Sequence, residues 1–264
     1  MERLKAIIKR LPPLYFLIKE RDQAISDKNQ LLKERAYLIE ERDRLLADSQ
    51  DFFLKEAKGV IHIGANLGQE RELYAKYNLE ILWVEPISNI FLQLQENLKP
   101  FPRQHALNYL LTDVDNKAYD FHIASNAGAS SSIFNFGKHQ EIWPEVNYLT
   151  SVILNSITFS TLVEIGEIDV SRYDSLVLDT QGAELLVLRG ARDLLRNFRF
   201  IKAEAADFES YEGCNTLDDL EDYLDPLGFK EVSKKRFAAK GGVGNYYDVI
   251  FERMSDPGSN LAVG

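Results

Sequence analysis

The stretch Gly59-Val60-Ile61-His62-Ile63-Gly64-Ala65-Asn66-Leu67-Gly68 decides the fold class of this chain. A short, mostly apolar run leads directly into two glycines four residues apart, and a helix is expected from Gln69 to about Tyr77. A strand, a glycine-containing turn and a helix in this order open a parallel α/β sheet. Because glycine lets backbone N–H groups approach a ligand closely, the turn is a candidate binding site.

The next segments repeat the alternation of strand and helix. Residues 80–86 are expected to form a buried strand that Pro86 ends, and residues 87–98 have a helical period. The order strand, helix, strand, helix predicts a doubly wound α/β sheet. Further strands are expected at residues 105–107, 118–123, 175–179, 200–204, 229–232 and 247–251, and further helices at residues 183–196 and 217–224.

About seventy residues separate the strand at 105–107 from the strand at 175–179. A connection of this length inside a compact domain is usually functional rather than a simple linker. It contains a loop of small and polar residues, 125–132, which is therefore a candidate part of the site.

The composition excludes several classes of protein. Hydrophobic residues make up 45% of the 264 residues, which is enough to build a core and excludes a chain disordered throughout. The net charge of −10 opposes binding to nucleic acid or to anionic lipid. The single cysteine, Cys214, excludes a disulfide framework and fits a reducing, cytoplasmic environment. Residues 14–18 are apolar but too few for a membrane span, which needs about 20.

The first fifty residues differ in pattern from the rest. No glycine or proline occurs from Glu20 to Asp48, so a single helix is expected there. A strict seven-residue period favours a coiled coil, and hence a homo-oligomer formed through this helix. The positions three residues further on carry Lys or Arg, so a solvated helix lying on its own domain is the alternative. The apolar series is Leu4, Leu11, Ile18, Ile25, Leu32, Ile39 and Leu46.

Three parts of the chain follow from these patterns. Residues 1–50 are expected to be a helical, coiled-coil segment, in which Pro12-Pro13 separates a short basic stretch from the helix. Residues 51–254 are expected to form the α/β domain, and residues 255–264 a disordered tail.

Glu85 adds information about the ligand of the glycine turn. It lies 17 residues after Gly68, at the end of the second strand, where a carboxylate can accept hydrogen bonds from both ribose hydroxyls of a nucleoside. The spacing of the turn is G-x-N-x-G and not the G-x-G-x-x-G of dinucleotide-binding proteins. These residues by themselves leave NAD, S-adenosylmethionine and a turn without any ligand open.

Residues 60–68 together with Val84-Glu85-Pro86 resemble the start of the FkbM family of S-adenosylmethionine-dependent methyltransferases. Residues 125–133 continue the resemblance. It is most specific in residues 178–191, which are similar to the family's D-x-E-G-A-E-x-x-V-L-x-G-A box, with Gln181 where the common form has Glu. The resemblance covers about residues 58–253. It implies a Rossmann-like class I methyltransferase fold with a seven-stranded sheet, S-adenosyl-L-methionine as cofactor, and usually O-methylation.

The resemblance also implies a set of cofactor-binding residues, with one departure. His62 stands where most such enzymes have Asp or Glu, a carboxylate that usually helps to hold the ammonium end of the cofactor. Glu70 is a candidate to supply that charge instead. Alternatively, His62 is a structural strand-end histidine and Glu70 only complements the helix dipole. The full expected set is His62, Gly64, Ala65, Asn66, Gly68, Glu70, Glu85 and Ser131.

Three residues are candidates for the chemistry of methyl transfer to a hydroxyl. Asp179 and Glu204 end adjacent strands, at the edge where open α/β sheets bind ligands. One of them is a candidate base, or both together could hold a divalent cation, Mg or Mn. The alternative for Asp179 is that it only caps the following turn. His139, expected to be exposed on a loop near Trp143, is a candidate base beside a sugar platform, and a solvated histidine without a role is the alternative.

The sequence therefore predicts a cytoplasmic S-adenosylmethionine-dependent methyltransferase. The resemblance indicates O-methylation of a hydroxyl in a sugar, glycan or related precursor. Two other functions are retained as alternatives. One is a catalytically silent module of the same fold that acts as an oligomeric scaffold in glycan assembly. The other is a nucleotide-dependent oxidoreductase, which the missing G-x-G-x-x-G pattern disfavours.

Overall fold

The computed structural model describes residues 12–254. The chain divides into two units, Met1–Ser49 and Gln50–Gly264, which we describe separately. The basic stretch expected at residues 1–11 and the disordered tail expected at residues 255–264 lie outside the described residues.

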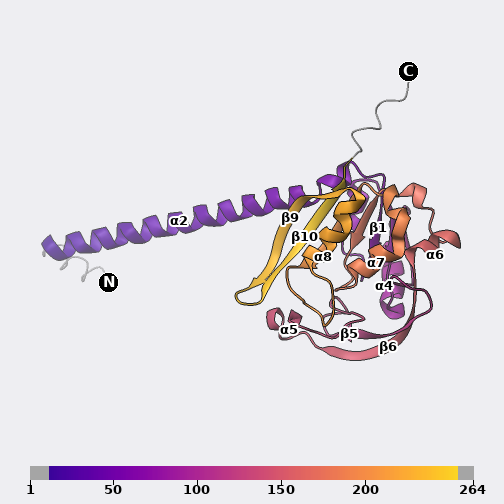
Figure 1. The fold of residues 1–264 in the computed structure, drawn as a ribbon. Coiled ribbons are helices and arrows are strands. Elements are labelled where there is room, and N and C mark those ends of the chain that lie inside the picture. Colours follow the sequence, from indigo (N-terminus) through magenta and orange to yellow (C-terminus); the bar gives the residue numbers. More distant parts are fainter. Residues whose placement is uncertain (1–11, 255–264) are drawn as a thin grey trace, which may run out of the picture. The chain divides into compact units, whose positions relative to one another are not determined.

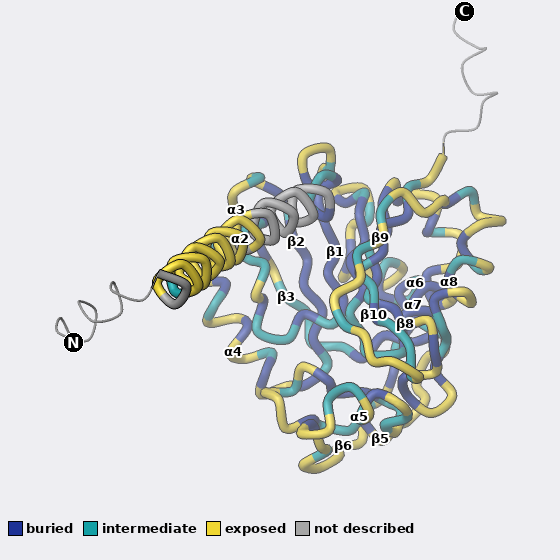
Figure 2. Tube along the Cα trace, turned by 90° about the vertical axis from the view of Figure 1, so that its left-hand side faces the viewer, coloured by how far each residue is buried: buried dark blue, intermediate teal, exposed yellow. Residues whose placement is uncertain are grey.

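The first unit contains a single described helix, α2 (Pro12–Gln50, 39 residues), which includes the expected helical range. Proline is favourable at the first turn of a helix because its missing N–H has no intrahelical partner there. Ile25 and Leu32, two members of the seven-residue series, are each 51% exposed, and Leu31 is 65% exposed. Figure 2 shows the same exposure along the helix. Within residues 12–254, no helix combines the length and apolar character needed to cross a bilayer.

The second unit is built on a seven-stranded sheet of order β3-β2-β1-β7-β8-β10-β9. Figure 1 labels strands β1, β9 and β10 of this sheet. Its first five strands pair in parallel, and the last two form an antiparallel hairpin that pairs with β8 through β10. This confirms the doubly wound, seven-stranded class I methyltransferase fold expected from the sequence. The strands are β1 (Gly59–Ile63), β2 (Glu80–Val84), β3 (Gln104–Leu107), β7 (Ser175–Leu178), β8 (Phe200–Ala206), β9 (Phe229–Lys240) and β10 (Gly244–Arg253).

Two apolar layers cover the sheet because side chains alternate along the strands. Val60 and Trp83 pack with the 3-10 helix η1 (Phe52–Lys55) and with α3 (Arg71–Lys76) and α4 (Ser88–Leu98). Ile61 and Leu82 pack on the opposite side with α6 (Phe159–Glu164), α7 (Glu184–Ala191) and α8 (Leu217–Leu224). Strand β1 is buried at all five of its positions, which explains its nearly continuous apolar sequence.

The long connection between β3 and β7 forms a second, small sheet of order β4-β6-β5. The expected strand is present as β5 (Ala118–Ala124), beside β4 (Leu110–Leu111) and β6 (Tyr148–Ile157). The sequence reading missed β6 because most of its residues are exposed, so it lacks an alternating pattern. A short helix, α5 (His139–Ile142), lies in the same connection.

Several expected boundaries shift. The helix expected at 183–196 is α7 followed by the 3-10 helix η3 (Arg192–Asn197), because Arg192 has a left-handed φ of +46° that ends the α-helix. The helix after the glycine turn begins at Arg71, which leaves Glu70 at its N-cap. Two further 3-10 turns, η2 (Val170–Arg172) and η4 (Asp225–Leu227), precede β7 and β9.

Gly64 determines how closely the ends of β1 and β7 approach each other. It has a φ of +87°, and a Cβ at this position would overlap the carbonyl oxygen of Asp179. The N–H of Asp179 donates to the carbonyl of Ile63 at 2.9 Å, so the two chain segments are in direct contact. Only glycine fits both the conformation and the space.

We predict that Gly64→Ala lowers the free energy of unfolding by roughly 2–5 kcal/mol, the sum of the left-handed φ and the overpacking against Asp179. Gly166→Ala is the matched control, because Gly166 has a similar φ of +82° but nothing within 4 Å of its Cβ position. The control should lose only about 1–2 kcal/mol. Equal losses in denaturant titrations would show that the contact with Asp179 is not a constraint.

Candidate active site

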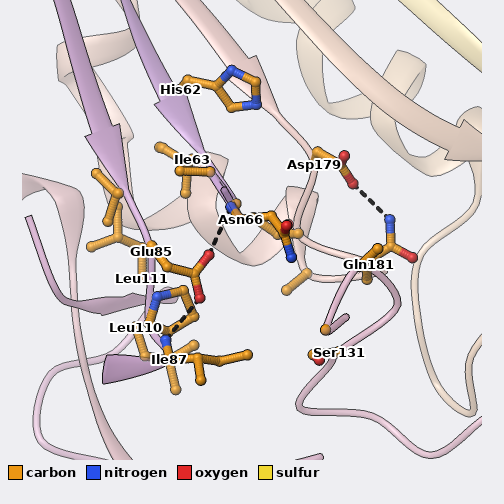
Figure 3. A pocket seen from close by; sticks show the side chains of 18 of the residues that line it. His62, Ile63, Asn66, Glu85, Ile87, Leu110, Leu111, Ser131, Asp179 and Gln181 are labelled. Carbon is orange, nitrogen blue, oxygen red and sulfur yellow. Dashed lines mark hydrogen bonds between the residues drawn. The ribbon is translucent and has the colours of Figure 1, made fainter. Parts of the chain in front are cut away.

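One cavity of the second unit, which we call the main cavity, lies at the carboxyl ends of β1, β2 and β7. Its volume is about 180 Å³, many times the space of one buried water molecule. In the sheet, β1 lies between β2 and β7, and the order of the strands reverses at β1. The cavity therefore lies at the switch point of the sheet, which is where open α/β sheets bind ligands. Figure 3 shows side chains from these strand ends and from the long connection around it.

The glycine turn contributes its shape to the cavity, not free N–H groups. The N–H groups of Gly64 and Ala65 donate to the carbonyl of Val84 at 3.0 and 3.1 Å. Those of Asn66, Leu67 and Gly68 also have partners within the protein. These N–H groups hold the turn against the end of β2 and within itself, and the turn borders the cavity through Gly64, Ala65 and Asn66.

Glu85 lies at the end of β2, and its carboxylate lines the cavity. One oxygen accepts from the N–H of Asn66 at 2.9 Å and the other from the N–H of Ile87 at 2.8 Å (Figure 3). Each oxygen keeps a further lone pair. Burial raises the pKa of Glu85 to about 7, although the two backbone hydrogen bonds act in the opposite direction.

Asn66 connects the glycine turn to the loop of small residues. It has a left-handed φ of +43°, and its side-chain amide donates to the carbonyl of Ala127, which also has a left-handed φ, at 3.1 Å. Ser131 accepts from the N–H of Ala124 at 3.0 Å and lines the cavity. The loop expected to be functional therefore forms one wall of the main cavity.

His62 is buried in an aromatic cluster. Its Nδ1 is 3.0 Å from the hydroxyl of Tyr74, and its ring stacks on Trp83 with centroids 4.7 Å apart. Burial, assisted by the positive charge of Lys202, lowers the pKa of His62 to about 3. The residue borders the main cavity as an uncharged ring, so it supplies no charge there.

Seven of the eight expected cofactor residues line the main cavity, and Gly68 does not. A Cβ on Gly68 would lie 2.7 Å from Leu94, so this glycine serves the packing of α4. Glu70 lines the cavity from the N-cap of α3. The seven are His62, Gly64, Ala65, Asn66, Glu70, Glu85 and Ser131.

Asp179 and Glu204 are joined by a residue that the sequence reading did not place in the site. The side-chain amide of Gln181 donates to Asp179 at 2.6 Å and to Glu204 at 3.2 Å. The Gln181 carbonyl oxygen accepts from the Tyr211 hydroxyl at 2.6 Å, which fixes the orientation of the amide. Burial raises the pKa of Asp179 to about 6, and burial together with the charge of Asp179 raises the pKa of Glu204.

Glu184 holds the loop that carries Gln181. Its carboxylate accepts from the N–H of Thr180 at 2.8 Å and from the N–H of Gly182 at 3.0 Å. Gln181 and Gly182 both have left-handed φ values, of +53° and +98°, so the loop needs this support. In the sequence, the feature that could have identified Glu184 as a functional residue is its position in the family box at residues 178–191, two residues after Gly182.

The sequence profile of the methyltransferase FkbM domain matches residues 62–231, about two thirds of the chain and most of the second unit. The chain belongs to the FkbM methyltransferase family.

One curated protein and two solved structures are similar to this chain. The 2-O-methyltransferase NoeI of Sinorhizobium fredii (strain NBRC 101917 / NGR234) is 26% identical over 173 residues, which are 62% of this chain and 70% of NoeI. Two solved structures are also similar. TrmK of M. capricolum with S-adenosyl-homocysteine has a TM-score of 0.42 and 7% identity over 74% of this chain and 62% of TrmK. The magnesium protoporphyrin IX methyltransferase ChlM from Synechocystis PCC 6803 has a TM-score of 0.42 and 10% identity, over 80% of this chain and 81% of ChlM.

A second cavity of this FkbM domain adjoins the main one. The two share Ala129, Asp179 and Gln181. The second cavity brings Glu204 and His139 together with Asp179, so the three expected catalytic residues border one space.

His139 differs from the expected exposed loop residue. It begins α5, is only 3% exposed, and lies among aromatic rings that include Phe136 and Trp143. Its Nδ1 is 2.7 Å from the Tyr246 hydroxyl, and its Nε2 has no hydrogen-bond partner among the described residues. Burial lowers the pKa of His139 to about 4, so the ring is uncharged at neutral pH.

The expected divalent cation gains no support from the described residues. Within residues 12–254, no group of three or more His, Cys, Asp or Glu side chains is arranged to hold a metal ion. Asp179 and Glu204 form only a pair, and the donating nitrogen of Gln181 lies between them.

Proposed function

We propose that this FkbM methyltransferase uses S-adenosyl-L-methionine to methylate a hydroxyl of a sugar, glycan or related precursor. The observation that carries the proposal is the buried Glu85 carboxylate at the end of β2, which lines the main cavity at the switch point of the sheet. NoeI, named as a 2-O-methyltransferase, supports a hydroxyl acceptor.

The residues of the main cavity fit the parts of the cofactor. Glu85 has lone pairs left for the two ribose hydroxyls. Ile87, Leu110 and Phe121 form an apolar wall suited to the adenine ring. Polar side chains that follow β1, those of Asn66, Gln69 and Glu70, also line the cavity and suit the amino-acid part of the cofactor.

The same geometry disfavours the oxidoreductase. A dinucleotide places its pyrophosphate on free N–H groups of the glycine turn. In this chain those N–H groups already donate to Val84, Glu85 and other atoms of the protein. The turn can therefore accommodate a neutral nucleoside beside it but lacks donors for two phosphates.

We assign binding and deprotonation of the acceptor hydroxyl to residues of the second cavity. When bound, S-adenosylmethionine supplies a methyl group that needs no further activation. A sugar hydroxyl is a poor nucleophile at neutral pH, so the protein must orient the hydroxyl and take its proton. Asp179 is our first candidate base because it borders both cavities and its pKa is raised to about 6, and Glu204 and His139 are its neighbours.

We predict that Glu85→Gln weakens binding of S-adenosylhomocysteine by roughly 10- to 150-fold, the value of about 1.5–3 kcal/mol for hydrogen bonds to a charged group. In the wild type, affinity should also fall as the pH is lowered through about 7, because protonation of Glu85 removes its charge. Calorimetry at several pH values measures both. Glu72→Gln, which removes an exposed carboxylate on α3, is the control and should bind normally. A Glu85→Gln variant that folds and binds like the control would remove Glu85 from the site.

The proposed reaction is tested by transfer of a labelled methyl group to fractionated cell glycans. We predict that Asp179→Asn lowers turnover by at least about 100-fold, the lower range for a positioned base, while binding of S-adenosylhomocysteine changes little. Asp193→Asn, an exposed residue of η3, should keep full turnover. Near-normal turnover in Asp179→Asn would move the search for the base to Glu204 and His139.

We further propose that α2 forms a homo-oligomer. Ile25 and Leu32 belong to the seven-residue apolar series and are half exposed along a long helix, which is costly unless a partner covers them. A cytoplasmic location belongs to the same proposal and rests on the single, free cysteine Cys214, because cytoplasmic proteins seldom depend on disulfides.

Light scattering of the full chain tests the oligomer. The wild type should have the mass of more than one chain, and the double variant Ile25→Asp with Leu32→Asp should have the mass of one. Asn29→Asp adds a charge off the apolar series and should keep the wild-type mass. A wild type that has the mass of one chain would refute the oligomer.

A further inference from the structure

Aromatic residues line part of the second cavity. Trp143, next to the end of α5, packs on His139 and Tyr246 with ring centroids 4.7 and 4.9 Å apart. Phe237 of β9 also lines the cavity, although its side chain is 42% exposed. An exposed aromatic ring beside a half-buried one offers a flat apolar surface on which the apolar face of a ring can stack.

Other residues that line the second cavity are polar, and none of them carries a positive charge. They are Asp179 and Glu204, with the amides of Asn126 and Gln181 and the hydroxyl of Ser130. No Lys or Arg is among the described residues that line the cavity. Lys202 is close enough to act on the pKa of Asp179, but it pairs with Asp248 at 3.7 Å and does not border the cavity.

His139 lines the second cavity and, within residues 12–254, carries a buried polar atom without a partner. Only 3% of the surface of His139 is exposed, and its Nε2 has no hydrogen-bond partner among the described residues. A buried polar atom without a hydrogen bond is rare and calls for an explanation. The ring is uncharged, so this nitrogen can pair with a hydroxyl or a carbonyl group without needing a charged partner.

We propose that the second cavity receives the acceptor as an uncharged, hydroxylated ring that stacks on Trp143 and Phe237, and that Glu204 excludes acceptors bearing a carboxylate near the reacting hydroxyl. This inference rests on the proposed function and specifies its substrate class. The physical reason is that this space already disfavours negative charge, since burial raises the pKa of Asp179 and of Glu204. A carboxylate on the acceptor would add a further negative charge, and the described residues that line the cavity include no cation to compensate it.

Matched pairs of glycosides test the inference with the full chain. The methyl glycosides of glucose, galactose and mannose are compared with those of the corresponding uronic acids, at saturating S-adenosylmethionine. The kcat/KM for methyl transfer should be at least tenfold higher for the neutral member of an accepted pair. In Glu204→Gln the neutral substrate should be slower, and the ratio between the members should fall below threefold. Glu212→Gln removes an exposed carboxylate outside both cavities and should keep the wild-type ratio.

Three results would overturn the inference: equal or faster transfer to the uronates, a ratio unchanged in Glu204→Gln, or transfer to none of the neutral glycosides. Calorimetry with S-adenosylhomocysteine separates this failure from failure of the proposed function. If the wild type binds it and labels glycan fractions, the function stands and only the charge selection fails. If the wild type does not bind it, the proposed function fails.

Discussion

The contact between Gly64 and the backbone of Asp179 is the constraint on which the site depends. It brings the ends of β1 and β7 together at the switch point of the sheet, so the turn after β1 and the loop after β7 border one cavity. The N–H groups of Gly64 and Ala65 donate to the end of β2, and the N–H of Asn66 donates to the Glu85 carboxylate and fixes its position. A single close approach of backbone thus places the carboxylates of Glu85 and Asp179 around the same cavity.

The loop after β7 shows how a strained segment is stabilised by buried carboxylates. Glu184 accepts from the N–H groups of Thr180 and Gly182, and this allows Gln181 a left-handed conformation. Gln181 in turn lies between Asp179 and Glu204, which would otherwise repel each other at short range. Strain of this kind is commonly stored at functional sites, where the surrounding structure can hold it.

The sequence predicted the sheet and most of the main cavity because strand ends in a doubly wound fold follow from chain order. Glu85 and Asp179 were located in this way. The state of His139 could not be predicted, since its burial depends on Tyr246, which is 107 residues away in the chain. Neither could the bridging role of Gln181, which requires its left-handed φ, nor the internal hydrogen bonding of the glycine turn. These features depend on tertiary packing, whereas the positions of the strands along the chain follow from local sequence patterns.

The central claim is that the cavity at the ends of β1, β2 and β7 holds S-adenosylmethionine with its ribose on Glu85. A crystal structure of the full chain with S-adenosylhomocysteine tests it most directly. The account predicts both ribose hydroxyls within hydrogen-bonding distance of the Glu85 carboxylate, and the sulfur on the side of the cavity that Asp179 borders. A nucleoside bound elsewhere, or a cavity that stays empty at saturating ligand, would contradict the account.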